Sequence, residues 1–359
     1  PVLAIFLVIS SPLYTVLMLS GMTEILGSLV LILSIFLFFK QKYIWSALVL
    51  SFMPFVRNEA LVILPLFFVA LIWLKQWKAI PFLAFGFIFY SIVGGFYYDD
   101  FLWVVNEMPY KGNAQGIYGS GELLHYVKAS KYIMGSGLSV LILAGLVLWI
   151  LDPMVKPKKP PKQWILESLV AYMPFMVYLA AHSYVWWKGA GNSVGMIRVM
   201  IAVLPSVALL GIFAYSRIME WIPVHNWIKQ LATGLFCIFL IFIPHKVYDI
   251  PVPLVGEQRI VKMATDWLSE SEYAGNRFFY YNPFFPHFLK IDPYDDALSH
   301  QFVHNRTNPE TKVEEGEIVI WDAHFSPNEG RLPLENLMNN PGYKLIHITR
   351  DKDPFTVLG

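Results

Sequence analysis

Charged side chains at the edges of long apolar segments are the first residues in this chain that could do chemistry. Glu24 stands near the start of one such segment, and Arg57 and Glu59 interrupt another in its middle. Charges within a membrane are costly and usually mark functional sites, although structural ion pairing is a real alternative. We predict a site role for all three. For Glu24, an ordinary first-turn glutamate favoured by the helix dipole is an equal alternative.

A second group of candidates follows position 181. His182, Lys188 and Arg198 lie in a stretch rich in glycine and aromatic residues. The planar guanidinium of Arg198 suits a phosphate or a carboxylate, and Lys188 and His182 could join it as ligands of the same anion. The glycines fit neither a Walker nor a dinucleotide pattern. The stretch therefore predicts an anion site without a nucleotide-binding loop.

Adjacent acids form a third group. Asp99 and Asp100 could bind an acceptor or a metal, or act in acid/base chemistry, although a solvated pair is the commoner case. Near the end of the chain, Asp322 and His324 follow a predicted strand and could hold a metal, with turn capping as the alternative. A divalent metal is thus left open as a cofactor.

The composition limits the classes of protein to which these candidates can belong. The chain has 359 residues, of which 56% are hydrophobic and 15% are charged, and its mean hydropathy is +0.50. A soluble chain holds about a quarter charged residues, so a water-soluble enzyme is excluded. A net charge of +1 leaves no basic footprint for nucleic acid. The lone Cys237 excludes an internal disulfide and a cysteine metal cage.

The charges are divided unevenly along the chain. Residues 1–250 hold 17 Lys and Arg against 10 Asp and Glu, whereas residues 251–359 hold 10 against 16. This division predicts a basic transmembrane domain at 1–250 and an acidic soluble domain at 251–359.

A membrane-crossing helix needs about 20 largely apolar residues. The expected spans are 23–39, 80–96, 133–151, 164–181, 195–215 and 231–243, preceded by 1–9 as the outer half of a helix whose beginning the sequence lacks. The segment 43–74 is too long for one crossing and is predicted to be a hairpin with Arg57 and Glu59 at its turn. The fold class is therefore an α-helical polytopic membrane protein of about eight spans, with a small C-terminal α/β domain.

The basic loops set the expected direction of these spans, since Lys and Arg collect on the cytoplasmic side. With the hairpin, all of them fall on one side: Lys40, Lys42, Lys75, Lys78, Lys156, Lys158, Lys159, Lys162, Arg217 and Lys229. The other polar segments then share the outer face, including the loops 97–132 and 182–196 and the domain 251–359. In that domain, 261–268 and 334–339 are predicted to be helices, and 277–281, 317–321 and 343–348 strands.

Two stretches resemble a known family. The order Ser20-Gly-Met-Thr-Glu24, an apolar helix, a basic turn and Val56-Arg-Asn-Glu59 is similar to the GT-C superfamily of polytopic glycosyltransferases. The stretch His182 to Arg198 is similar to an outer loop and following helix of that superfamily, and the resemblance covers roughly residues 10–215.

The resemblance implies a mannosyltransferase-like enzyme. Such an enzyme would move a sugar from a polyprenyl-phosphate donor to a lipid, glycan or protein acceptor on the outer face of a bacterial plasma (inner) membrane. By resemblance, Glu24, Arg57 and Glu59 line the site and His182 and Arg198 lie near the donor phosphate. The principal acidic base of the family belongs to a first outer loop, which would precede Pro1. Two other classes stay open: a multi-pass transporter or flippase, and a non-catalytic envelope assembly protein.

Overall fold

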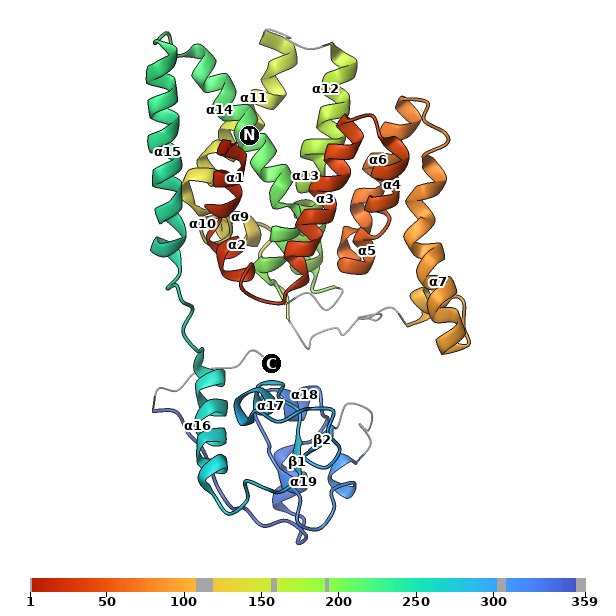
Figure 1. Cartoon of the computed structure of the whole chain (residues 1–359), viewed down its shortest axis with the longest axis vertical. Coiled ribbons are helices and arrows are strands. Elements are labelled where there is room, and N and C mark those ends of the chain that lie inside the picture. The colour runs from red at the N-terminus through yellow and green to blue at the C-terminus, as the bar shows by residue number, and fades with distance from the viewer. Residues whose placement is uncertain (1, 108–118, 156–159, 191–193, 302–307, 353–359) are drawn as a thin grey trace. The chain divides into compact units, whose positions relative to one another are not determined.

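The computed structural model describes residues 2–107, 119–155, 160–190, 194–301 and 308–352 (Figure 1). The chain divides into two compact units, Pro1–Val252 and Pro253–Gly359. We call them the membrane unit and the C-terminal unit.

The described residues of the membrane unit are helical, with short connections. Its elements are α1 (Val2–Ile9), α2 (Pro12–Leu17), α3 (Thr23–Phe39), α4 (Tyr43–Leu50), α5 (Met53–Val56), η1 (Asn58–Ile63), α6 (Leu64–Trp73), η2 (Ile80–Ala84), α7 (Phe85–Tyr98), α8 (Trp103–Asn106), α9 (His125–Lys128), α10 (Ser130–Ile133), α11 (Gly135–Val155), α12 (Pro161–Glu167), η3 (Ser168–Tyr172), α13 (Met173–Lys188), η4 (Ile197–Val203), α14 (Leu204–Trp221) and α15 (Asn226–Val247).

Five helical runs among the described residues are long and apolar enough to cross a membrane: Ile80–Tyr98, Gly135–Asp152, Pro161–Lys188, Ile197–Trp221 and Asn226–Val247. Three further apolar helices, Thr23–Phe39, Tyr43–Val56 and Asn58–Trp73, are shorter. The prediction of a helical membrane protein is confirmed. Of the about eight spans expected, five reach full length.

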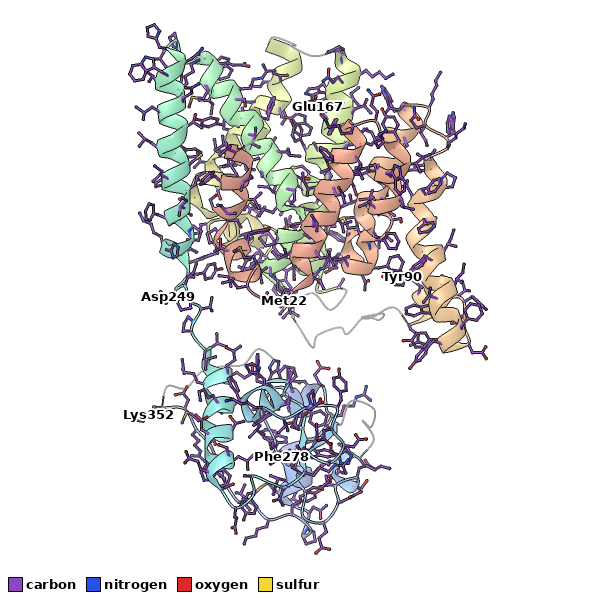
Figure 2. The ribbon with its side chains drawn as sticks, viewed as in Figure 1. Met22, Tyr90, Glu167, Asp249, Phe278 and Lys352 are labelled. Atoms are coloured by element: carbon purple, nitrogen blue, oxygen red, sulfur yellow. The ribbon has the colours of Figure 1, made fainter. Side chains whose placement is uncertain are left out.

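The membrane unit has two ends, which the labelled residues of Figure 2 identify. Met22 and Asp249 lie at one end and Glu167 lies towards the other. We call these the Met22 end and the Glu167 end. The connections α3 to α4, α6 to η2 and α14 to α15 all lie at the Glu167 end (Figure 1). The structure therefore places the loops with Lys40, Lys42, Lys75 and Lys78 together, as the hairpin prediction required.

The hairpin itself is built from short pieces whose boundaries follow prolines. Proline lacks the N–H that an α-helix needs and clashes with the carbonyl four residues earlier. Helix α4 ends at Leu50, four residues before Pro54, and the chain then reverses direction at Arg57. Two other prolines, Pro65 and Pro205, stand at the starts of α6 and α14, each directly after a 3₁₀ segment.

The core of the membrane unit lies around η4 and α14. Residues Val199 to Leu204 are fully or almost fully buried, and α14 packs closely on α11 and α3. The approach to α11 requires a glycine, because a Cβ at Gly145 would lie 2.8 Å from the carbonyl oxygen of Leu210. Helix α14 follows η4 directly, and η4 lies at the Met22 end of the unit, where it packs against α3.

The C-terminal unit is a small α/β fold. Its elements are α16 (Gly256–Glu270), β1 (Phe278–Tyr280), α17 (Phe284–Leu289), β2 (Ser299–Gln301), η6 (Pro309–Thr311), β3 (Ile318–Val319), α18 (Phe325–Asn328) and α19 (Leu334–Met338). The strands form a parallel sheet in the order β2-β1-β3. The central strand β1 is buried along its length and packs against α16 and α17 through Val261, Leu268 and Phe285.

One strand prediction in this unit was wrong, and one strand was not predicted. Residues 343–348 form no strand, and Leu345 and Ile348 are exposed there. Strand β2, which the sequence pattern did not predict, pairs with β1 instead. Alternation of apolar residues is a property of a single segment. Whether that segment forms a strand also depends on which other segment lies beside it at the edge of the sheet.

Candidate functional site

The carboxylate of Glu24 is the centre of the candidate site. It lies in the first turn of α3, where the helix dipole stabilises a negative charge. Its side chain is fully buried. A buried carboxylate needs charged partners, and both partners come from distant parts of the chain.

Arg57 supplies the first of these partners. It stands between α5 and η1 with an extended backbone (φ −147°, ψ 110°), so the helix α5 ends there. Its Nη1 donates to Oε1 of Glu24 at 2.9 Å, and its Nη2 donates to Oε1 of Glu59 at 2.7 Å. One guanidinium thus joins two carboxylates, one wholly buried and one 38% exposed.

Arg198 supplies the second partner. Its Nε lies 3.2 Å from Oε1 of Glu24, and its Nη1 lies 3.4 Å from the sulfur of Met22. Its side chain is 35% exposed, against 15% for Arg57. Arg198 is therefore the more accessible of the two cations that face Glu24.

The contact between α3 and η4 is fixed one turn beyond these charges. The hydroxyl of Ser28 donates to the carbonyl oxygen of Ile201, which Pro205 leaves without an α-helical donor. At Gly27, a Cβ would lie 3.3 Å from Cβ of Ala202, so the two backbones meet closely. Glu24 stands four residues before Ser28, on the same face of α3.

His182 and Tyr178 form the side of the site that α13 provides. Sequence analysis placed His182 in a loop, and this was wrong, because α13 continues to Lys188. Both side chains are buried, and their ring centroids are 4.5 Å apart. Both lie close enough to Arg57 and Glu59 for electrostatic interaction, and α13 packs on η1.

Sequence reasoning missed Tyr178 and Ser28. The signal was present in each case as a spacing of four residues on a helix, from Tyr178 to His182 and from Glu24 to Ser28. Residues four apart on a helix share a face. Because a loop was expected at 182–196, His182 was not expected to share a helix face with Tyr178.

Several buried polar atoms in this cluster have no hydrogen-bond partner among the described residues. They are Oε2 of Glu24, Nε of Arg57, Nε of Arg198 and Nε2 of His182. Buried polar groups are nearly always paired, and each unpaired group requires an explanation. Four such atoms beside an Arg-Glu network mark a place where water or a polar ligand would complete the hydrogen bonding.

The other predicted site residues make different contacts. The ammonium of Lys188 lies 3.9 Å from the ring centroid of Trp187. Asp100 accepts hydrogen bonds from the backbone N–H of Leu102 and the amide of Asn106. These two bonds hold the pKa of Asp100 below its ordinary value. Asp99 directly follows α7 with its backbone in the left-handed conformation, and its side chain is exposed.

No metal site is visible in the part of the chain that the structure describes, because no three His, Cys, Asp or Glu residues there form a suitable group. Asp322 accepts from the backbone N–H groups of His324 and Phe325, so it caps the turn before α18. His324 contacts Glu257 through Nδ1 at 3.2 Å. Asp322 thus makes the turn-capping bonds that the alternative to a metal ligand expected.

The chain was compared with protein-family models, curated proteins and solved structures. No protein-family model matches the chain, and no curated protein or solved structure is detectably similar to it. The resemblance to the GT-C superfamily therefore rests on the quoted residues alone.

Proposed function

We propose that this protein is a membrane glycosyltransferase that moves a sugar from a polyprenyl-phosphate donor to a lipid, glycan or protein acceptor on the outer face of the membrane. The observation that supports this most is the cluster of Glu24, Arg57, Glu59 and Arg198 at the Met22 end, with unpaired polar atoms beside it. The proposal includes eight crossings, a bacterial plasma membrane and an extracytoplasmic C-terminal unit.

The exposed fractions of the four side chains suggest a division of roles. Arg198, the more accessible cation, binds the donor phosphate. Glu24 is fully buried and positions both arginines. Glu59 is the more exposed carboxylate and accepts from a hydroxyl of the acceptor or the sugar.

The transfer requires one bond to break and one to form. The bond between the anomeric carbon and the phosphate oxygen breaks, and the phosphate keeps the electron pair. The acceptor oxygen forms the new bond and gives its proton to a carboxylate. Because negative charge develops on the leaving phosphate, a preorganised guanidinium stabilises the transition state more than the ground state.

The position of the charges favours an enzyme over a transporter. Transporters hold their substrates near the bilayer midplane, often at broken helices. Here Glu24 stands in the first turn of α3 and Arg57 at the hairpin turn, both at the Met22 end. Phosphate and sugar of a lipid-linked donor lie at such a membrane surface.

The test uses the intact protein in proteoliposomes with a labelled polyprenyl-phosphate sugar and a panel of acceptors. Arg198→Ala and Glu59→Gln should each lower turnover roughly 100-fold to 1000-fold, as loss of one preorganised group does. Arg259→Ala is the matched control, since this exposed arginine pairs with Asp351 in the C-terminal unit.

The proposal would be overturned if the three single variants Arg57→Ala, Arg198→Ala and Glu59→Gln all showed unchanged turnover. Movement of label across the membrane without a new glycosidic product would instead establish a transporter or flippase.

A further inference from the structure

A pocket of about 310 Å³ lies at the Glu167 end of the membrane unit, between the connection from α3 to α4 and the start of α12. Its apolar walls are Phe38, Phe39, Leu74 and Leu166. The ring of Phe38 is almost fully buried and packs edge-on against Tyr43, with 5.3 Å between the ring centroids. The pocket therefore has a firm apolar floor, and none of the residues assigned to the candidate site lines it.

The polar residues of the pocket supply hydrogen-bond donors. Lys162, Gln41 and Tyr43 line it, and each carries a side-chain N–H or O–H group. None of these three donors has a side-chain hydrogen bond or ion pair with another described residue. Gln163, the fourth polar residue, donates its amide to Glu167 at 3.0 Å. No Asp or Glu is among the described residues that line the pocket, so its polar groups suit an anion.

The turn that carries Gln41 normally requires glycine. After α3, the backbone N–H of Lys42 donates to the carbonyl oxygen of Leu37 at 2.9 Å, and Gln41 has a φ of 58°. A residue with positive φ at the end of a helix is usually glycine, because a Cβ is unfavourable there. The side chain of Gln41 therefore contributes nothing to the turn that glycine would not, and it can be removed without straining the backbone.

Further lysines lie at the same end of the unit without lining the pocket. They occupy the connections from α3 to α4 and from α6 to η2, and all are exposed: Lys40, Lys42, Lys75 and Lys78. Within the described part of the chain, none of them forms an ion pair. Asp152 and Glu220, two acids of this end, pair with Arg217 instead. Unpaired lysines near a membrane surface attract anionic lipids, so they raise the concentration of such lipids at the pocket.

We propose that this pocket binds an anionic phospholipid of the leaflet at the Glu167 end, with a head group that carries a phosphate and no cation, as in phosphatidylglycerol. The phosphate accepts hydrogen bonds from Lys162 and Gln41. An acyl chain lies against Leu166 and Phe39, which is 45% exposed. A zwitterionic head group would bring an ammonium to a pocket whose described lining holds no carboxylate to receive it. The proposal is independent of the transfer reaction.

The test is native mass spectrometry of the intact protein from nanodiscs with equal parts of phosphatidylglycerol, phosphatidylethanolamine and phosphatidylcholine. The wild type should retain the glycerol lipid preferentially. Lys162→Gln should weaken this retention roughly tenfold, because a charge-assisted hydrogen bond to the phosphate is lost. Lys78→Gln is the matched control, since it removes the same charge at the same end from an exposed residue outside the pocket. It should weaken retention by less than about twofold, because salt screens exposed charges.

A second variant separates lipid binding from folding. Gln41→Gly removes a donor from the pocket while its backbone keeps a φ that glycine adopts readily. Retention of the glycerol lipid should fall roughly threefold, as for one neutral hydrogen bond, and the unfolding temperature in micelles should not fall. Equal retention of the three lipids, preference for a zwitterionic lipid, unchanged retention in Lys162→Gln, or equal losses in Lys162→Gln and Lys78→Gln would overturn the proposal.

Discussion

The two ends of the membrane unit each bury an arginine among carboxylates, but they satisfy it differently. At the Glu167 end, Arg217 uses both terminal nitrogens on Asp152 and Glu220, and among the described residues none of its buried nitrogens lacks a hydrogen-bond partner. At the Met22 end, Arg57 binds Glu24 and Glu59, yet Nε of Arg57 and Oε2 of Glu24 have no partner among the described residues. A satisfied pair holds helices together, whereas an incomplete one leaves polar atoms whose hydrogen bonds water or a ligand can complete.

The largest effect expected from this comparison is on stability, at the Glu167 end. Arg217→Ala leaves Asp152 buried without its partner and should cost about 3 to 5 kcal/mol of unfolding free energy. The measurement is unfolding of the purified protein in mixed micelles, with turnover per folded molecule followed in parallel.

A double replacement provides the control for Arg217. Arg217→Met with Asp152→Leu removes both charges together and should be near neutral. A large loss in the double variant as well would show that the pair is not the source of the stability.

The second effect is on activity, at the Met22 end. Glu24→Gln removes the charge that holds Arg57 and Arg198 in place, and misplacing a binding group by about 1 Å costs roughly 100-fold in rate. Turnover per folded molecule should fall. Asp152→Asn should lower stability and leave turnover per folded molecule unchanged, and equal effects of the two variants on turnover per folded molecule would remove the distinction between the ends.

A third effect sharpens the role of packing at the Met22 end. Gly27→Leu forces a side chain against Ala202 and Cγ of Arg57, which a Cβ would already approach to 3.3 Å and 3.6 Å. We expect a loss of about 1 to 3 kcal/mol together with lower turnover. Gly234→Leu is the matched control, since nothing lies within 4 Å of a Cβ there.

The smallest effect concerns the hydrogen bond one turn away from Glu24. Ser28→Ala removes the donor to the carbonyl oxygen of Ile201 and should cost about 0.5 to 1.5 kcal/mol. Ser139→Ala, whose hydroxyl donates within its own helix to Gly135, should cost less. A larger loss at Ser139 would show that the contact between α3 and η4 is held by other groups.

Much of the fold could be predicted because it depends on local signals. The apolar segments and the basic loops marked the helices and their connections, and helix Thr23–Phe39 begins and ends where it was expected. The errors occurred where local signals end. His182 was placed in a loop because its stretch is polar, although α13 carries it with one face buried against Tyr178.

The sequence by itself determined that this chain is a helical membrane protein with charges at the ends of its apolar segments, since the cost of placing charge in hydrocarbon acts on each segment separately. Only the tertiary structure decided which charges meet. Glu24 and Arg57 are 33 residues apart, and Arg198 joins them from a third segment. Any of several acids could have paired with either arginine. The choice follows from the close contact of α3 with η4 at Gly27 and Ser28 and from the chain reversal at Arg57, which are properties of packed helices and not of any single one.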